Sequence, residues 1–117
     1  ADYDRAVAEH RIDLALLGAE LAGLIETIER PDHLLVENVA VAPAFQGRGL
    51  GRRLMIHAEA SQRRRGRAEI RLYTNACFTE NIALYRRLGY RVDREEQLPH
   101  SVAVHMSKPV VPQGATP

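Results

Sequence analysis

The glycine-dense stretch from Gln46 to Gly51 constrains the fold of this 117-residue chain more than any other feature. An apolar run that reads as a strand, Leu34–Val41, precedes it, and a helical apolar pattern, Leu50–Arg65, follows at once. A glycine loop between a strand and a helix exposes consecutive backbone N–H groups at the positive end of the helix dipole. This arrangement predicts a binding site for a phosphate-like anion.

Two familiar phosphate-binding loops do not fit this stretch. The Walker pattern requires a lysine followed by serine or threonine after its last glycine, but Gly51 is followed by Arg52 and Arg53. The dinucleotide-binding pattern requires a third glycine where Arg52 stands. We therefore expect a different phosphate loop, with Arg48, Arg52 and Arg53 adding positive charge at its rim. A glycine-rich turn with solvated arginines is the alternative.

Turn residues divide the rest of the chain into short elements. The turn Gly18-Ala19 predicts a hairpin, in which Gly23 marks a bulge or a close backbone approach. Thr79 is expected to cap the start of a second helix and Gly89 its end, while Gly66 caps the first helix. The other predicted elements are a helical turn at Arg5–Glu9, strands over Ile12–Leu17, Leu21–Ile28, Ala68–Tyr73 and Ser101–Met106, a helix over Thr79–Leu88 and a strand opening at Tyr90.

Composition excludes several protein classes. Hydrophobic residues make up 45% and charged residues 26%, as in globular domains. No apolar run approaches the ~20 residues that span a bilayer, and no signal peptide is visible, so a cytoplasmic protein without a membrane partner is expected. The single cysteine, Cys77, excludes an internal disulfide and has no supporting pattern as a nucleophile. His33 and His105 lack ligand spacing and His57 reads as structural, so no metal is expected.

The arginines are clustered although the net charge is only +1. The run Arg63–Arg67 is typical of a solvated helix end, and contact with a phosphate group of a ligand or an RNA-binding surface are the alternatives. No aromatic residues interleave with the run, so no nucleic-acid partner is expected.

Three segments, taken together, resemble the GNAT N-acetyltransferase superfamily. The first resembles its acetyl-CoA-binding signature, whose pattern Gln/Arg-x-x-Gly-x-Gly/Ala is met by Gln46, Gly49 and Gly51. The last resembles the helix end that carries the family tyrosine. The segments are Val39–Leu54, Ile70–Asn75 and Tyr85–Tyr90, within a resemblance that covers roughly residues 11–108.

The resemblance implies an α/β fold with a mixed, mostly antiparallel sheet and helices on both faces. The strands 34–41 and 68–73 form a right-handed β-α-β unit and splay apart to admit the pantetheine arm of CoA. A single domain is expected over residues 1–108, with a flexible tail over 109–117. The family's first strand and first helices are expected to be missing, which leaves the CoA half intact and the amine half in doubt.

The resemblance also implies the residues that bind acetyl-CoA. Backbone N–H groups of the loop hold the pyrophosphate, and Val39 and Val41 pair with the pantetheine arm. An N–H at or near Val41 polarises the thioester carbonyl, and Tyr85 protonates the leaving thiolate. Asn75 or Asn81 contacts the CoA arm, or else caps the helix or bonds within its loop. The implied cofactor-binding set is Val39, Ala40, Val41, Gln46, Gly47, Arg48, Gly49, Leu50, Gly51, Arg52, Asn75, Asn81 and Tyr85.

Glu37 is the candidate general base. It lies two residues before Val39, so strand alternation predicts that the two share a face, and many family members carry a carboxylate on this strand. A solvated charge on a strand is the alternative.

The expected activity is transfer of acetyl from acetyl-CoA to a primary amine of a small molecule or peptide, by direct attack in a ternary complex and without a metal. The alternative is a catalytically incomplete CoA-binding module or fragment, which the missing front favours and the pair Glu37 and Tyr85 opposes. An exposed sheet edge near Ile12 is expected to support a homodimer. The apolar residues expected to be uncovered there are Leu14, Leu16, Leu21 and Ile25.

Overall fold

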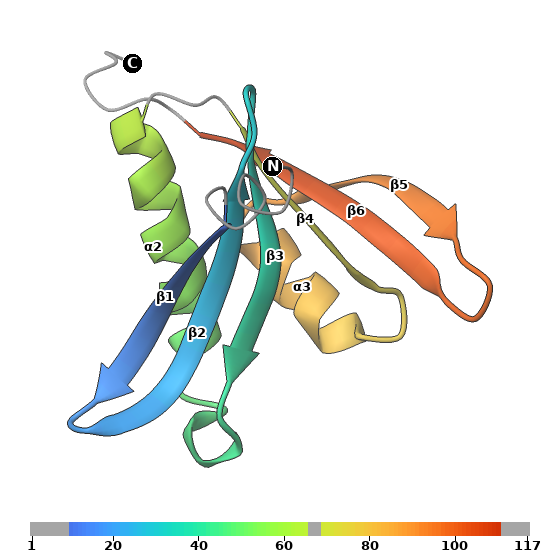
Figure 1. Ribbon diagram of the computed structural model, residues 1–117. Coiled ribbons are helices and arrows are strands. Elements are labelled where there is room, and N and C mark those ends of the chain that lie inside the picture. The colour runs from blue at the N-terminus through green and yellow to red at the C-terminus, as the bar shows by residue number, and fades with distance from the viewer. Residues whose placement is uncertain (1–9, 66–68, 111–117) are drawn as a thin grey trace, which may run out of the picture.

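Six strands form one sheet in the order β1-β2-β3-β4-β6-β5 (Figure 1). The structure, a computed structural model, describes residues 10–65 and 69–110. Only β3 and β4 pair in parallel, so the expected mixed, mostly antiparallel sheet is confirmed. The elements are β1 (His10–Leu17), β2 (Glu20–Glu29), β3 (Leu34–Val41), the 3-10 turn η1 (Pro43–Phe45), α2 (Leu50–Arg65), β4 (Glu69–Asn75), α3 (Thr79–Arg87), β5 (Arg91–Gln97) and β6 (Val102–Pro109).

Both described helices lie against the same face of the sheet (Figure 1). The start of α2 approaches α3, because a Cβ atom built on Gly51 lies 4.0 Å from side-chain carbons of Leu84 and Val41. The buried apolar core lies between this face and the helices, with Met55 and Ile70 completely buried. The expectation of helices on both faces is therefore wrong for the residues described, and the opposite sheet face carries no described helix.

The parallel pair β3–β4 opens at one end. Backbone pairing begins at Leu34 opposite Ile70 and ends at Val36 opposite Leu72, although both strands continue beyond it. On its other side β3 shifts register at Glu37, because Val36 and Asn38 pair with consecutive residues of β2. The bulge and the divergence lie at the same level of the sheet. The expected splay between these strands is confirmed.

Most predicted elements are present, and the hairpin has the expected turn. Gly23 marks both a bulge and a close approach. The register of β1 and β2 shifts beside it, and a Cβ at Gly23 would lie 2.7 Å from the carbonyl oxygen of Ala40. β4 extends beyond the predicted Tyr73 to Asn75. The helical turn at 5–9 and the cap at Gly66 lie outside the described residues.

Two end signals were misassigned. The N-cap of α3 is Phe78, not Thr79, and it makes no side-chain capping hydrogen bond. The reason is that the first helical bond joins Ile82 N to the Phe78 carbonyl. Pro109 ends β6 opposite Glu69, and Val110 is buried in the core, so the predicted tail does not begin at residue 109.

The edge strand β1 exposes apolar side chains, as expected. Leu14, Leu16 and Leu21 are 50–58% exposed, whereas Ile25 is buried, so its predicted exposure is wrong. The described ranges contain no helix that is long and apolar enough to cross a membrane.

Candidate functional site

The glycine loop leads from β3 through η1 into α2. Gly47 and Gly49 adopt φ angles of 78° and 77°, a left-handed conformation that non-glycine residues rarely adopt. A Cβ on either glycine would meet nothing within 4 Å, so the surface above both is open. The first turn of α2 carries no acidic residue, and its first N–H groups are available to an anion. The loop therefore has the backbone geometry and electrostatics of an anion site.

Side chains fix and charge this loop. Gln46 Nε2 donates a 3.2 Å hydrogen bond to the carbonyl of Val41, which ties the loop to the end of β3. The guanidinium of Arg48 lies 5.6 Å from the ring centroid of Phe45. Within the described part of the chain, no carboxylate pairs with Arg48 or Arg52. Their charges remain available for an anionic ligand.

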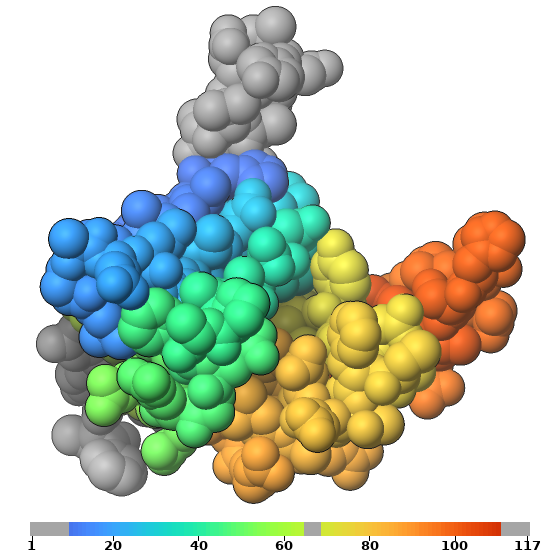
Figure 2. Space-filling model, turned by 90° about the horizontal axis from the view of Figure 1, so that it is seen from below, coloured from blue at the N-terminus to red at the C-terminus, as the bar shows by residue number. Residues whose placement is uncertain are grey.

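The splay between β3 and β4 holds a pocket of about 280 Å³ that is closed on one side by α3. Viewed from below in Figure 2, the surface is hollowed between the β3 side, in green, and the β4–α3 side, in yellow. Five residues predicted from sequence line this pocket together: Glu37, Val39, Asn75, Asn81 and Tyr85.

Glu37 and Tyr85 face this pocket from opposite walls. Tyr85 is half-buried on α3, and burial raises the pKa of its phenol above the usual value of 10. Its hydroxyl makes no hydrogen bond to any residue in the described ranges, and its ring meets Tyr90 edge-on at 6.0 Å between centroids. A protonated phenol facing a carboxylate across a pocket is suited to acid–base chemistry.

Tyr73 is the residue of this site that sequence reasoning missed. Its hydroxyl donates a 3.1 Å hydrogen bond to Glu37 Oε1. Burial, followed by the hydrogen bond and the charge of Glu37, raises the pKa of Tyr73. The two residues come directly after the last parallel pair, Val36 and Leu72, so their side chains join where the backbones separate. Asn38, Thr74 and Phe78 also line the pocket and were not predicted.

The bulge corrects the reasoning that led to Glu37. Simple alternation placed Glu37 and Val39 on one face, but the register shift at Glu37 interrupts the alternation. Both nevertheless line the same pocket. Asn75 makes the loop hydrogen bond that was one of its two interpretations, because its Oδ1 accepts from the backbone N–H of Cys77 at 2.8 Å.

His57 and Cys77 do not line the pocket in the splay. His57 on α2 lies 3.0 Å from Asp13 of β1, a contact that fits its structural interpretation. Cys77 is exposed and lines a separate hollow together with Phe78 and Asn81, which also line the pocket in the splay. Among the described residues, no group of three or more metal-ligating side chains could hold a metal ion.

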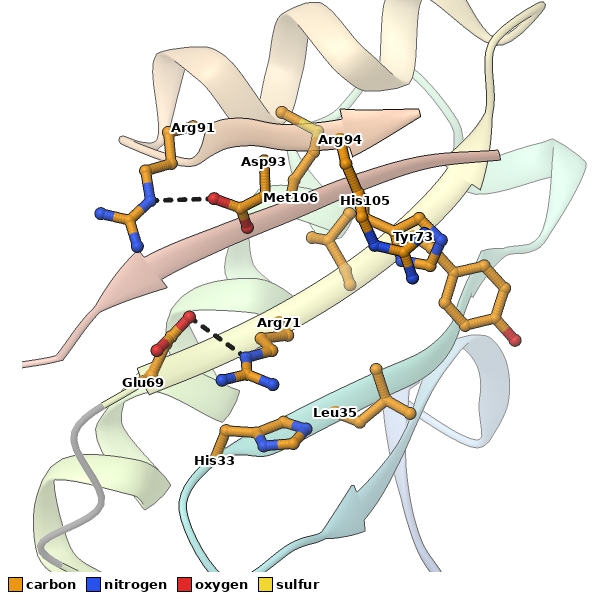
Figure 3. Close-up of a pocket in the computed structure, with 11 residues that line it drawn as sticks. His33, Leu35, Glu69, Arg71, Tyr73, Arg91, Asp93, Arg94, His105 and Met106 are labelled. Atoms are coloured by element: carbon orange, nitrogen blue, oxygen red, sulfur yellow. Dashed lines mark hydrogen bonds and ion pairs between the residues drawn. The ribbon is translucent and has the colours of Figure 1, made fainter. Parts of the chain in front are cut away.

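A larger cavity of about 550 Å³ lies on the sheet face that carries no described helix. Figure 3 shows polar side chains of β4, β5 and β6, His33 from the turn before β3 and the apolar Leu35 of β3 around it. Leu72 and Tyr73 line both this cavity and the pocket in the splay, so the two adjoin at these residues. The charged and imidazole side chains that line it are His33, Glu69, Arg71, Arg91, Asp93, Arg94 and His105.

A splayed parallel pair, a glycine loop at a helix start and a pocket between them define an acyl-CoA-binding type of fold, and comparisons with known proteins agree. Residues 6–92 match the acetyltransferase (GNAT) domain family. The chain is 37% identical over 100 residues to N-alpha-acetyltransferase 80 of Mus musculus, which covers 79% of this chain and 31% of that protein. This protein therefore belongs to the GNAT acetyltransferase family. It spans less than a third of the length of that relative.

Solved structures share the fold over most of the chain. The ribosomal-protein-S18-alanine N-acetyltransferase from Escherichia coli superposes with a TM-score of 0.85 at 24% identity and covers 100% of this chain and 81% of its own. An acetyltransferase from Bacillus subtilis, crystallised in complex with CoA, has a TM-score of 0.78 at 21% identity and covers 94% and 83%.

Proposed function

We propose that this domain transfers an acetyl group from acetyl-CoA to a primary amine by direct attack in a ternary complex. The observation that carries the proposal is the pocket between the splayed strands, with Glu37 and Tyr85 on its walls. The names of similar proteins include a ribosomal-protein-S18-alanine N-acetyltransferase and a streptothricin acetyltransferase, so amines of both proteins and small molecules belong to the proposed acceptors.

Acetyl-CoA fits the loop and the splay in this proposal. Backbone N–H groups over 47–52 bind the pyrophosphate, helped by the open surface above Gly47 and Gly49. The strand residues Val39, Ala40 and Val41 pair with the pantetheine arm, and Gln46 supports the loop from below. Leu50 and Gly51 contribute the first helical turn, while Asn75 or Asn81 contacts the arm in the pocket.

The proposed reaction needs one base and one acid. Glu37 accepts a proton from the bound ammonium, directly or through water, and the free amine attacks the thioester carbonyl. A C–N bond forms and the C–S bond breaks, while an N–H at or near Val41 stabilises the developing oxyanion. Tyr85 then donates its proton to the departing thiolate, and the proton that the attacking nitrogen loses to form the amide returns to the phenolate through water.

A screen of primary amines with acetyl-CoA, measured by release of free thiol, tests this function. Amine-dependent thiol release is expected for at least one acceptor class. A chain that binds CoA but releases no thiol with any amine would be a binding module instead. The proposal includes a cytoplasmic location, in keeping with the single cysteine, and no metal or nucleic-acid partner.

Tyr73→Phe is expected to lower the rate about tenfold, because it removes a hydrogen bond to a charged group that holds Glu37 in place. The substitution keeps the ring contact with His105, whose centroid lies 5.7 Å away. Steady-state rates with a saturating amine measure the effect.

The double variant Tyr73→Phe with Glu37→Gln provides the control. If Tyr73 acts through Glu37, the double variant is no slower than Glu37→Gln alone. Additive losses would show that Tyr73 has an independent role.

We also propose that the chain forms a homodimer through the edge strand β1. Among the described strands β1 has a neighbour on one side only, and such an edge invites pairing with a second chain. Ile12, Leu14 and Leu16 on this strand are 57–58% exposed. Leu14→Asp is expected to give a monomer by light scattering, whereas Ile56→Asp on α2 should leave the dimer intact. A monomeric wild type whose specific activity is unchanged by dilution would contradict this proposal.

A further inference from the structure

We propose that the cavity on the sheet face without a described helix is the acceptor site, and that its acceptor is an amine that also carries a carboxylate or phosphate group. This inference rests on the proposed acetyl transfer and adds the chemical class of the acceptor. The cavity has a volume of about 550 Å³, which lies within the ~300–1,000 Å³ range of small-molecule sites.

The position of the reacting amine follows from a residue that the two cavities share. Tyr73 lines both cavities, and its hydroxyl contacts the carboxylate of Glu37. An ammonium that enters through this cavity therefore meets Tyr73 and Glu37 at the mouth of the splay. The rest of the acceptor extends along the cavity away from the thioester.

The charges in the cavity cancel in pairs. Arg71 Nε donates to Glu69 at 3.1 Å, and Arg91 Nε donates to Asp93 at 3.0 Å. Both carboxylates that line the cavity are thereby occupied by guanidinium groups.

The histidines lining the cavity also have carboxylate partners. His33 contacts Asp32 at 2.7 Å, and His105 contacts Glu96 at 2.9 Å. These acidic partners lie beside the cavity rather than in its lining. Because Arg71 and Arg91 occupy the two lining carboxylates, no described carboxylate in the lining is left for another cation.

Arg94 is the exception in this pattern. Among the described residues it makes no hydrogen bond or ion pair. It pairs across β5 and β6 with His105, which pairs in turn with Tyr73 of β4. Figure 3 shows Arg94, His105 and Tyr73 next to one another along the cavity. An uncompensated guanidinium therefore lies in the same cross-strand row as Tyr73, which marks the position of the reacting amine.

The distance from Tyr73 to Arg94 across the strands sets the size of the acceptor. Neighbouring strands lie about 4.8 Å apart, so the backbones of Tyr73 and Arg94 are separated by about 10 Å. The arginine side chain shortens the remaining gap. An acceptor whose amine and anionic group are separated by about 5–10 Å can reach Glu37 and Arg94 together.

Matched acceptors test the class. ω-Amino acids of four to six carbons are compared with ω-amino alcohols of equal length, which have amines of similar basicity. We expect kcat/KM to be about 10- to 100-fold higher for the acids, the size of one charge-assisted contact. Equal or better turnover of the alcohols would overturn the proposal.

Variants tie the preference to one residue. Arg94→Gln should remove the preference for the acids while the alcohols react at the wild-type rate, and Arg94→Lys should retain part of it. Arg87→Gln is the control, because Arg87 is exposed at the end of α3 outside both cavities. A preference that survives Arg94→Gln would overturn the assignment.

A binding measurement separates this inference from the proposed reaction. By calorimetry, 5-acetamidopentanoate, the acetylated product, should bind the wild type more tightly than 5-acetamidopentanol, with and without CoA. Arg94→Gln should remove the difference. If this holds while no amine releases thiol, only the proposed reaction fails. Equal binding of the two products to the wild type overturns the anionic acceptor whatever the activity.

Discussion

Gly49→Val is expected to abolish the rise in melting temperature that CoA and acetyl-CoA give the wild-type protein. A ligand at a hundred times its dissociation constant stabilises the native state by about 2.7 kcal/mol, on the order of 10 °C in a domain of this size. Gly49 has a φ of 77°, and the space above it is open. A β-branched side chain there resists this φ and occupies the space that the pyrophosphate would use. Differential scanning fluorimetry measures the effect.

Gly18→Val is the matched control for backbone strain. Gly18 lies in the β1–β2 turn with a φ of 64°, and a Cβ there also meets nothing within 4 Å. Both variants should lose similar stability without ligand, but only Gly18→Val should keep the CoA-induced shift. A wild-type protein that is folded but binds no CoA by calorimetric titration would remove the whole interpretation of the loop.

The loop and its flanking elements could be predicted from sequence because their signals are local. Leu34–Val41 and Leu50–Arg65 have their predicted bounds. The signals are an apolar run that ends before Pro43, two glycines and a helical period. Each of them depends only on residues that are close together in the sequence. Gly89 likewise ends its helix as predicted, with a φ of 98° and with Tyr90 N donating to the carbonyl of Tyr85.

The errors arise where a bulge or a neighbouring strand decides. Leu21 and Ile25 share a face by alternation, but the extra residue Ala22 turns them to opposite faces. Pro109 reads as a tail residue, yet β5 pairs with β6 only as far as Ser107. Its missing N–H is therefore not needed there, so proline is tolerated at the end of the strand.

The contact between Tyr73 and Glu37 could not be found from sequence. The two residues lie 36 positions apart, and they meet only because the parallel pairing ends one residue before each of them. The bulge at Glu37 and the pairing of β3 with β4 depend on contacts between strands that are distant in the sequence. Sequence patterns predicted the splay through the family resemblance, but not which side chains join across its mouth.

Tyr85→Phe is expected to lower kcat by about 100- to 10,000-fold while leaving CoA affinity unchanged, as for the loss of a general acid. Burial raises the pKa of Tyr85, so its phenol remains protonated over pH 6–9. The loss should therefore be uniform over this range. Glu37→Gln should instead lower the rate most at low pH, where the amine is protonated and its deprotonation limits the reaction.

Tyr90→Phe separates this effect from a loss of stability. Tyr90 is buried, meets the ring of Tyr85, and donates a 3.0 Å hydrogen bond to Glu59 away from the pocket. Its loss should destabilise the fold by about 1–3 kcal/mol, although Lys108 still contacts Glu59 at 2.8 Å. Turnover below the melting temperature should remain near that of the wild type. If Tyr90→Phe lowers kcat as much as Tyr85→Phe, packing of the tyrosine pair accounts for the loss and Tyr85 is not the acid. Full turnover of Tyr85→Phe would likewise show that Tyr85 is not the acid.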